Sequence, residues 1–229
     1  ALALTPTRDG GYAIAGFTFS EGNGMSDIWV MKVDAYGQEQ WRQLFGDDGY
    51  EWANDLVETR DGNLVIAGYQ RDRETGLRNA WVFQVNRHGD LMWSKEYGGE
   101  EGDEAKALTQ TNDGGFAVVG YSHSFSKGKS DVWLLRLNAV GEELWQKHYG
   151  TREAEKGYSI SETHDEGFII GGFQYAGEAN KADMLAVRLD RNGEGIWRKV
   201  FRETGNGVIE SILETPQGNI LAAGWGFDE

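Results

Sequence analysis

The sequence repeats itself every 52 residues, and this period restricts the chain to folds that are built from copies of one unit. No insertion or deletion interrupts the period, and glycine and tryptophan positions mark it most clearly. The marker residues are Gly16, Gly68, Gly120, Gly172 and Gly224, together with Trp41, Trp93, Trp145 and Trp197. We therefore treat residues 1–229 as one domain, with repeats at 1–52, 53–104, 105–156 and 157–208 and a partial repeat at 209–229.

Each repeat contains four strand-like segments separated by turns, as the third repeat shows. Residues 105–111 are rich in small side chains, residues 116–121 are apolar, residues 131–137 are largely apolar, and residues 143–150 alternate between apolar and polar. Continuous apolar runs are typical of strands covered on both faces, and alternation is typical of a half-exposed strand. The small side chains of the first segment predict a crowded centre. The lower apolar content of the last segment predicts that it lies at an outer rim. No segment shows the 3.6-residue apolar period of a helix over roughly ten residues.

Four antiparallel strands in a unit of this length predict an all-β fold, a β-propeller with four-stranded antiparallel blades. Because the sequence holds only half of a fifth repeat, the last blade is incomplete. We prefer a five-bladed ring with a short last blade. The alternatives are a fragment of a larger ring, or a ring completed by strands of another chain. An open ring would expose an apolar blade face and allow self-association.

Charge and cysteine content limit the partners. With 22 basic and 37 acidic side chains, the net charge of −15 disfavours binding to nucleic acid or to an anionic membrane surface. No apolar run approaches the roughly 20 residues that cross a bilayer, so we expect no membrane insertion. The absence of cysteine excludes disulfides and thiolate metal sites. The chain begins at Ala1 without a visible signal peptide, as a mature chain or an excised fragment would.

The repeat pattern also resembles a known family. Residues 9–41 contain a DGG turn, an apolar strand ending in glycine, an SD-x-W strand, a D-x-x-G turn and a tryptophan strand. This pattern resembles the tandem propeller repeats of secreted or cell-surface proteins of bacteria and archaea, and the likeness covers the whole chain. The resemblance implies an extracytoplasmic location and a role in binding or display.

A weaker resemblance is to quinoprotein propellers, in which a tryptophan-docking motif joins neighbouring blades. Asp34, Gly37, Trp41 and Gly46 match that motif, whereas Arg202 replaces the final glycine in the fourth repeat. Quinone-binding enzymes of this kind often use a vicinal cysteine pair, which this chain lacks. We therefore expect no quinone and no other cofactor.

Residues that recur in every repeat are expected to serve the scaffold. We interpret the recurring tryptophans as packing between blades. A second recurring position is acidic or amidic, with Glu58, Gln110, Glu162 and Glu214. These side chains either form a cation-binding ring in a central channel or pair with a polar position of the third segment, which holds Lys32, Gln84, Arg136 and Arg188. We favour the pairing.

Departures from the repeat are the better candidates for function, above all on the connections between repeats. Trp52 is unique, because Glu104, Lys156 and Val208 occupy its equivalent positions. It is either an apolar platform for a ligand or a plug against the neighbouring blade. The predicted ligand-binding residues on these polar loops are Tyr50, Glu51, Trp52, Asp103, Glu104 and Glu155. The alternative for the carboxylates is a solvated face.

No nucleophile, metallohydrolase or phosphate-loop motif is present, so we assign no catalytic and no metal-binding residue. The function we predict is a non-catalytic secreted or surface module that binds a glycan or a protein segment. One alternative is a structural spacer or a fragment of a larger propeller protein. Another is a glycan hydrolase that uses loop carboxylates. A third alternative, suggested by the regular spacing, is a repeat protein made by design or recombination.

Overall fold

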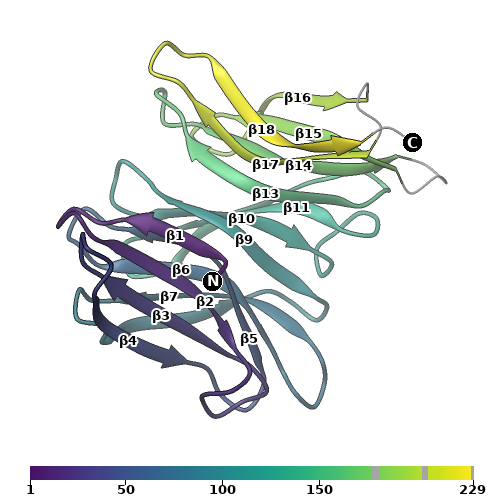
Figure 1. Cartoon of the computed structure of the whole chain (residues 1–229). Coiled ribbons are helices and arrows are strands. Elements are labelled where there is room, and N and C mark those ends of the chain that lie inside the picture. Colours follow the sequence, from purple (N-terminus) through teal and green to yellow (C-terminus); the bar gives the residue numbers. More distant parts are fainter. Residues whose placement is uncertain (177–180, 203–205, 228–229) are drawn as a thin grey trace.

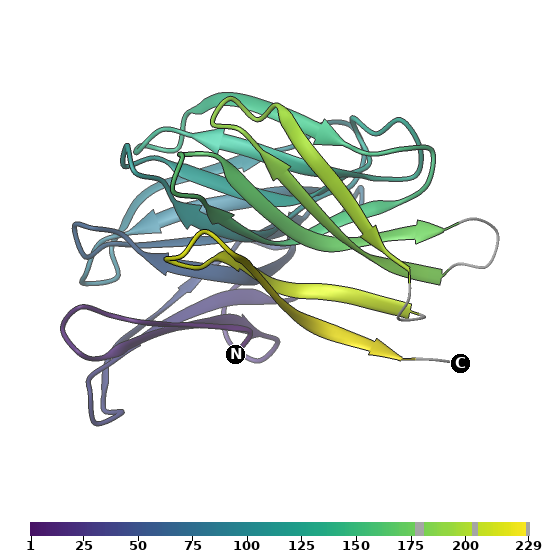
Figure 2. The same ribbon diagram turned by 90° about the horizontal axis from the view of Figure 1, so that it is seen from above.

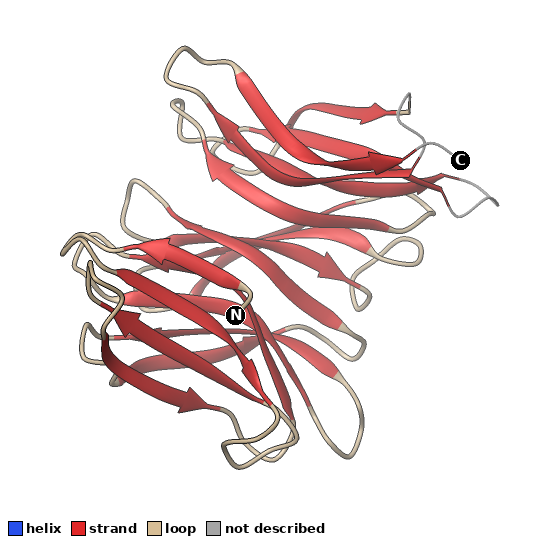
Figure 3. Cartoon of the chain, in the orientation of Figure 1, coloured by secondary structure: helices blue, strands red, loops and turns tan. Residues whose placement is uncertain are grey.

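The chain forms an all-β structure, seen in a computed structural model that describes residues 1–176, 181–202 and 206–227 (Figure 1, Figure 3). Four antiparallel four-stranded sheets and one two-stranded sheet follow one another in chain order. The described residues contain no helix, and thus no apolar helix of membrane-spanning length. Viewed from above, the stack of sheets is curved, and the purple first sheet and the yellow fifth sheet lie on the same side of the green sheets (Figure 2).

The strands of each sheet are consecutive in the chain. The first sheet contains β1 (Ala3–Pro6), β2 (Tyr12–Thr18), β3 (Asp27–Val33) and β4 (Glu39–Phe45). The second contains β5 (Tyr50–Glu58), β6 (Leu64–Arg71), β7 (Arg78–Val85) and β8 (Leu91–Tyr97). The third contains β9 (Asp103–Gln110), β10 (Phe116–Ser122), β11 (Asp131–Leu137) and β12 (Glu143–Tyr149). The fourth contains β13 (Glu155–Glu162), β14 (Phe168–Ala176), β15 (Lys181–Leu189) and β16 (Gly195–Phe201), and the fifth β17 (Asn206–Glu214) and β18 (Ile220–Phe227).

Apolar layers fill the spaces between consecutive sheets. Ile28 and Val30 of the first sheet pack with Leu56 and Phe83 of the second, and similar layers lie at the later junctions. In the third sheet every residue of β10 and β11 is buried, which explains their continuous apolar sequences. The last strands β4, β8, β12 and β16 are largely exposed or half-buried, as the apolar gradient predicts.

The recurring tryptophans join neighbouring sheets, as predicted. A Cβ atom on Gly89 would lie 2.9 Å from the Trp41 ring, and one on Gly141 would lie 2.7 Å from the Trp93 ring. Gly193 receives Trp145 in the same way. Each of these glycines lies in the turn before the last strand of the next sheet and has a positive φ. Glycine is required there both for the backbone conformation and for contact with the indole.

The recurring Glu58 position has a different role from either one we predicted. The Glu58 carboxylate accepts a hydrogen bond of 2.9 Å from the main-chain N–H of Arg8, in a turn of the preceding sheet. The same bond recurs at Gln110, Glu162 and Glu214. Lys32 instead pairs with Asp9 at 2.8 Å, and Arg136 and Arg188 bind the equivalent aspartates Asp113 and Asp165. The prediction that these cations pair with the Glu58 position was wrong, because the turn aspartate of each sheet lies closer.

Truncation of Trp93 tests the packing between sheets. We expect Trp93→Ala to lower the free energy of unfolding by about 3 kcal/mol, because it removes a docked indole and leaves a void beside Gly141. Urea denaturation followed by far-UV circular dichroism measures this loss. Trp197→Ala is the control, since the two-stranded fifth sheet offers no such glycine turn and the loss should be smaller. A loss below about 1 kcal/mol for Trp93→Ala would contradict the docking role.

Candidate functional site

The first strands of four sheets, together with Leu2 just before β1, border one shared cavity of about 510 Å³. The cavity is lined by residues from one repeat position, each 52 residues from the next, and by their neighbours on the strands. The residues at this position are Leu2, Asn54, Lys106, Tyr158 and Glu210. At this one position the repeats therefore differ in chemistry, with an apolar, an amide, a cationic, an aromatic and an acidic side chain.

A β-bulge directs four of these side chains into the cavity. In the second sheet Ala53 pairs with Gly68 and Asp55 with Ala67, so Asn54 has no partner on β6. The same irregularity leaves Lys106, Tyr158 and Glu210 unpaired in the following sheets. An extra residue in one strand of an antiparallel pair re-aims its side chain. The bulge therefore repeats with the scaffold while the side chain that it presents changes.

The recurring glycine of the second segment is the counterpart of this bulge. A Cβ atom on Gly68 would lie 1.8 Å from the carbonyl oxygen of Trp52, and one on Gly120 would lie 1.8 Å from that of Glu104. Gly172 and Gly224 face equally close carbonyl oxygens. A glycine inside a strand often marks such an approach of another backbone. This was the sequence signal for the site residues, which our sequence reasoning missed.

Charged and aromatic groups lie close together near the cavity. The buried Glu104 carboxylate accepts a bond of 2.7 Å from Lys106 Nζ and also pairs with Arg78. Lys156 Nζ lies 3.6 Å from the centroid of the Tyr121 ring, and burial lowers the pKa of this lysine. A cation over an aromatic face is a favourable arrangement. The first strands of the third and fourth sheets therefore each place a lysine near the cavity, although the chain as a whole is acidic.

Asp55 serves the scaffold at the cavity wall. Its two carboxylate oxygens accept bonds of 2.9 Å from the main-chain N–H groups of Leu56 and Leu108. Burial raises the pKa of Asp55 to about 6, and the two N–H donors act against this rise. Ser159 Oγ makes the corresponding bond to the N–H of Ile212 in the next pair of sheets. We infer that this position joins first strands rather than performing acid–base chemistry.

Predicted ligand residues of the first connection lie on a strand and not on a loop. Tyr50, Glu51 and Trp52 form the start of β5, and Glu51 is fully buried. Trp52 stacks on Phe17 of the first sheet, with ring centroids 3.4 Å apart, and also lines the cavity. It is therefore a contact between sheets, and its role as a ligand platform stays a prediction. Tyr50 lies beneath the guanidinium of Arg71.

The other three predicted ligand residues are also in strands. Asp103 and Glu104 begin β9, Glu155 begins β13, and all three are buried, so neither a polar loop nor a solvated face describes them. Asp103 accepts a bond of 2.8 Å from the N–H of Gly99, and Glu155 accepts one of 3.2 Å from the N–H of Thr151. Asp103 and Glu155 are buried because each one holds the turn that leads into its own strand, whereas Glu104 is buried between Lys106 and Arg78.

Glu51 occupies the same repeat position as Asp103 and Glu155 but differs from both. Neither of its carboxylate oxygens has a hydrogen-bond partner. Burial raises the pKa of Glu51 to about 8, and the nearby charges of Asp47 and Asp27 act in the same direction. Arg71 lies opposite Tyr50 on the neighbouring strand, and its guanidinium packs over the Tyr50 ring and does not pair with Glu51.

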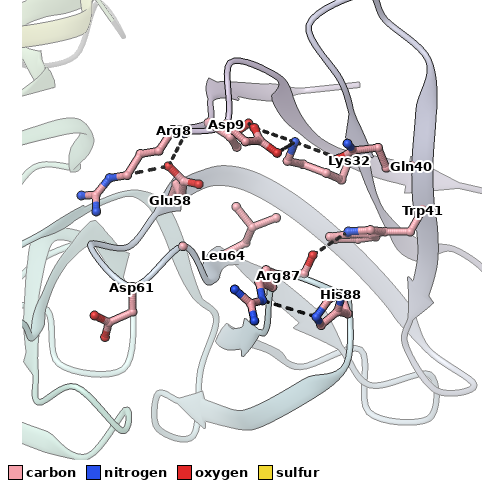
Figure 4. Close-up of a pocket in the computed structure, with 12 residues that line it drawn as sticks. Arg8, Asp9, Lys32, Gln40, Trp41, Glu58, Asp61, Leu64, Arg87 and His88 are labelled. Carbon is pink, nitrogen blue, oxygen red and sulfur yellow. Dashed lines mark hydrogen bonds and ion pairs between the residues drawn. The ribbon is translucent and has the colours of Figure 1, made fainter.

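A second cavity, of about 650 Å³, is a groove between the first and second sheets (Figure 4). In the close-up, Lys32 points to Asp9, Glu58 points to Arg8, and the Trp41 indole donates to the carbonyl of Arg87. An equivalent groove, lined by the corresponding residues, lies between the third and fourth sheets. Because the groove recurs and its Lys32 and Glu58 side chains already have partners in Asp9 and Arg8, we assign it to the scaffold.

Within residues 1–176, 181–202 and 206–227, no three His, Cys, Asp or Glu side chains surround a common point in the way a preformed metal site requires. The four histidines lie on different elements, and His88 and His164 are exposed. The chemistry of the described cavity is thus that of hydrogen bonding, charge and aromatic stacking.

Comparison with known proteins defines the fold more than the function. No family model matches the sequence. The chain is 23% identical over 219 residues to the regulatory protein FlaEY of Caulobacter vibrioides, covering 85% of this chain and 21% of that protein. The chain therefore spans about a fifth of the length of this curated relative.

Solved structures share the architecture at low sequence identity. A protein of unknown function from Dyadobacter fermentans matches with a TM-score of 0.60 and 14% identity, over 97% of this chain and 73% of that chain. A hypothetical protein from Leishmania major matches with a TM-score of 0.50 and 10% identity, over 96% and 78% of the two chains. These likenesses concern the fold alone.

Substitution of Glu51 tests its unusual environment. With a pKa raised from the ordinary 4.5 to about 8, folded Glu51 keeps a proton that the unfolded chain has released. Stability from this proton is complete below a pH of about 4.5 and is lost as the pH rises through about 8. Glu51→Gln mimics the protonated acid, so its free energy of unfolding should change less than that of the wild type over this interval.

Urea denaturation at several pH values measures this difference. Glu155→Gln is the matched control, because it disturbs an acceptor already bound by Thr151 and should destabilise the chain across the whole interval. If the free energies of unfolding of the wild type and Glu51→Gln changed equally with pH, Glu51 would not be protonated in the folded chain.

Proposed function

We propose that the chain is a non-catalytic binding module of the β-propeller type, which holds a glycan in the cavity bordered by the first strands of its sheets. Four-stranded antiparallel sheets that share a cavity at their first strands are the arrangement expected of propeller blades. The module would act outside the cytoplasm, as the repeat pattern implies.

The variation at the bulged position is the observation that carries the proposal. Asn54, Lys106, Tyr158 and Glu210 are directed into the cavity by the same bulge, yet they share no chemistry. Packing demands on these four copies are alike, so a purely structural role would favour alike side chains. The difference between the copies fits selection by an asymmetric ligand.

A glycan suits the mixture of groups in the cavity. Trp52 and Tyr158 add aromatic surface to the cavity lining, while Asn54, Lys106 and Glu210 offer hydrogen-bond donors and acceptors. Ligand sites usually combine such apolar surface with a few convergent polar groups. Binding without turnover is also compatible with a regulatory role, which the name of the Caulobacter relative states for that protein.

Hydrolysis is less well supported than binding. A glycosidase of the usual kind needs two carboxyl groups, one as acid and one as base or nucleophile. In the cavity, both oxygens of Asp55 are occupied by main-chain N–H donors, and Glu210 Oε1 accepts a bond of 3.0 Å from the indole of Trp225. These contacts do not favour the two carboxylates as an acid and base pair, although Glu210 Oε2 can still accept a bond from a ligand.

A glycan array with the purified chain tests the proposal. We expect Tyr158→Ala to weaken binding of any glycan that the wild type retains by roughly tenfold, the equivalent of about 1.4 kcal/mol. His88→Ala, in the groove of Figure 4, is the control and should bind as the wild type does. Circular dichroism and thermal unfolding verify that both variants fold.

The remaining outcomes of this experiment favour other functions. Equal binding by Tyr158→Ala and the wild type would move the glycan site away from the cavity. Capture of a peptide but no glycan would identify a protein ligand. An absence of binding to either class would favour the structural spacer.

A further inference from the structure

Three cationic side chains gather around one buried carboxylate beside the cavity that the first strands border, here called the first-strand cavity. Glu104, which is 2% exposed, accepts a bond of 2.7 Å from Lys106 Nζ and also pairs with Arg78. Lys156 belongs to the same group, because its ammonium and that of Lys106 lie 3.6 and 5.7 Å from the centroid of the Tyr121 ring. This basic cluster therefore holds three positive charges against one negative charge, in a chain whose net charge is −15.

Lys156 has no carboxylate partner in the part of the chain that the structure describes. Its half-buried ammonium faces the Tyr121 ring, and no other described side chain accepts a hydrogen bond from it. The buried cations of the third strands differ in this respect, since each of them, as Lys32 does with Asp9, binds the aspartate of a turn. An ammonium group carries three N–H donors, so Lys156 has donors left for an acceptor outside the chain.

The charges of the basic cluster also act against one another. Burial lowers the pKa of Lys156, and the positive charges of Lys106 and Arg78 act in the same direction, against the opposing effect of Glu104. A second negative group close to Lys156 would relieve this repulsion.

Both lysines are departures from the repeat. The position of Lys156 holds Trp52, Glu104 and Val208 in the other repeats, and the position of Lys106 holds Asn54, Tyr158 and Glu210. Trp52 stacks on Phe17 of the preceding sheet, whereas Lys156 faces Tyr121, which is the equivalent of Phe17. The aromatic partner is thus retained while an apolar contact is replaced by a charge, and packing between sheets does not require that replacement.

The basic cluster borders two cavities. Lys106 lines the first-strand cavity, and Arg78, Glu104 and Tyr121 line a third, smaller cavity of about 330 Å³. A ligand in the first-strand cavity can therefore reach Lys106 directly, and Lys156 beside the ring that both lysines face.

The acidic residues of the first-strand cavity leave the lysine charges unbalanced. Asp55 uses its two oxygens on main-chain N–H groups, and Glu210 Oε1 accepts a bond of 3.0 Å from the Trp225 indole. Among the described residues, no ion pair joins either carboxylate to Lys106 or Lys156. An anionic group of a ligand can supply the missing acceptor, and hydrogen bonds between charged partners are the strong ones.

We propose that the ligand of the first-strand cavity is an acidic glycan, whose sugar carboxylate is bound by Lys106 and Lys156 beside the Tyr121 ring. This assignment rests on the glycan-binding function proposed above and names the class of glycan. A uronate offers two acceptor oxygens to the two ammonium groups. Its ring has apolar C–H groups for the Tyr158 side chain, whose ring centroid lies 6.0 Å from Lys106 Nζ. Because the rest of the chain is acidic, it repels anionic ligands elsewhere and favours this cluster.

Calorimetry of the full chain with matched pairs of oligosaccharides tests the proposal. The probes are oligomers of galacturonate, glucuronate and mannuronate, each together with its methyl ester, which has the same sugar backbone without the charge. We expect one of the acids to bind roughly tenfold more tightly than its ester, because hydrogen bonds to charged groups are stronger than neutral ones. This preference should decrease as the salt concentration rises.

Lysine variants locate the carboxylate. Lys156→Met keeps an apolar side chain over Tyr121 but removes the charge, so the acid should bind it no more tightly than the ester. Lys156→Arg keeps the charge and should retain the preference. Lys199→Met is the matched control, because Lys199 Nζ also lies over an aromatic ring, 5.4 Å from the centroid of Trp197, but on the outer strand β16 of the same sheet. Circular dichroism verifies that the variants fold.

The outcomes separate this assignment from the glycan-binding function itself. Equal affinity of the wild type for acid and ester would overturn the acidic-glycan assignment and leave the binding of neutral glycans standing. An equal loss of preference in Lys199→Met and Lys156→Met would also overturn it, because net charge alone would then explain the preference. Binding of no glycan, acidic or neutral, would overturn both the assignment and the proposed function.

Discussion

The structure depends on the burial of each sheet against the next. A single four-stranded sheet of this chain has apolar side chains on both faces of its middle strands, so it is stable only between neighbours. The docking of Trp41, Trp93 and Trp145 onto glycine turns fixes the spacing and orientation of consecutive sheets. Hydrogen bonds from each sheet to the turn of its predecessor, as at Glu58, secure the same junctions.

This scaffold explains where chemistry is free to vary. The faces of the sheets are committed to packing, and recurring ion pairs line the grooves at the tryptophan ends. The bulged position of each first strand is exempt from these demands, because its side chain leaves the sheet and enters the shared cavity. A regular fold can therefore present four different side chains, such as Lys106 and Tyr158, from one backbone feature.

The same repetition makes electrostatic differences between junctions informative. Buried carboxylates recur beside the glycine that follows the last strand of each of the first three sheets, and their partners differ from junction to junction. At Asp103 and Glu155 the partners are hydroxyl, N–H or guanidinium groups, whereas Glu51 has none. Since the backbone is nearly the same in each copy, this contrast reflects side-chain chemistry and not a difference in fold.

The sequence by itself determined the period, the four strands of each repeat and the packing role of the tryptophans, because these depend on local patterns that recur at a fixed spacing. It did not reveal that Glu51 and Glu155 begin strands, since a carboxylate next to a turn looks the same in sequence whether it is solvated or buried. Apart from Trp52, the cavity residues were also missed, although Gly68 and its copies marked the bulge. Only the tertiary structure brings Leu2 and the first strands of the other four sheets together, and that convergence decides which side chains share a site.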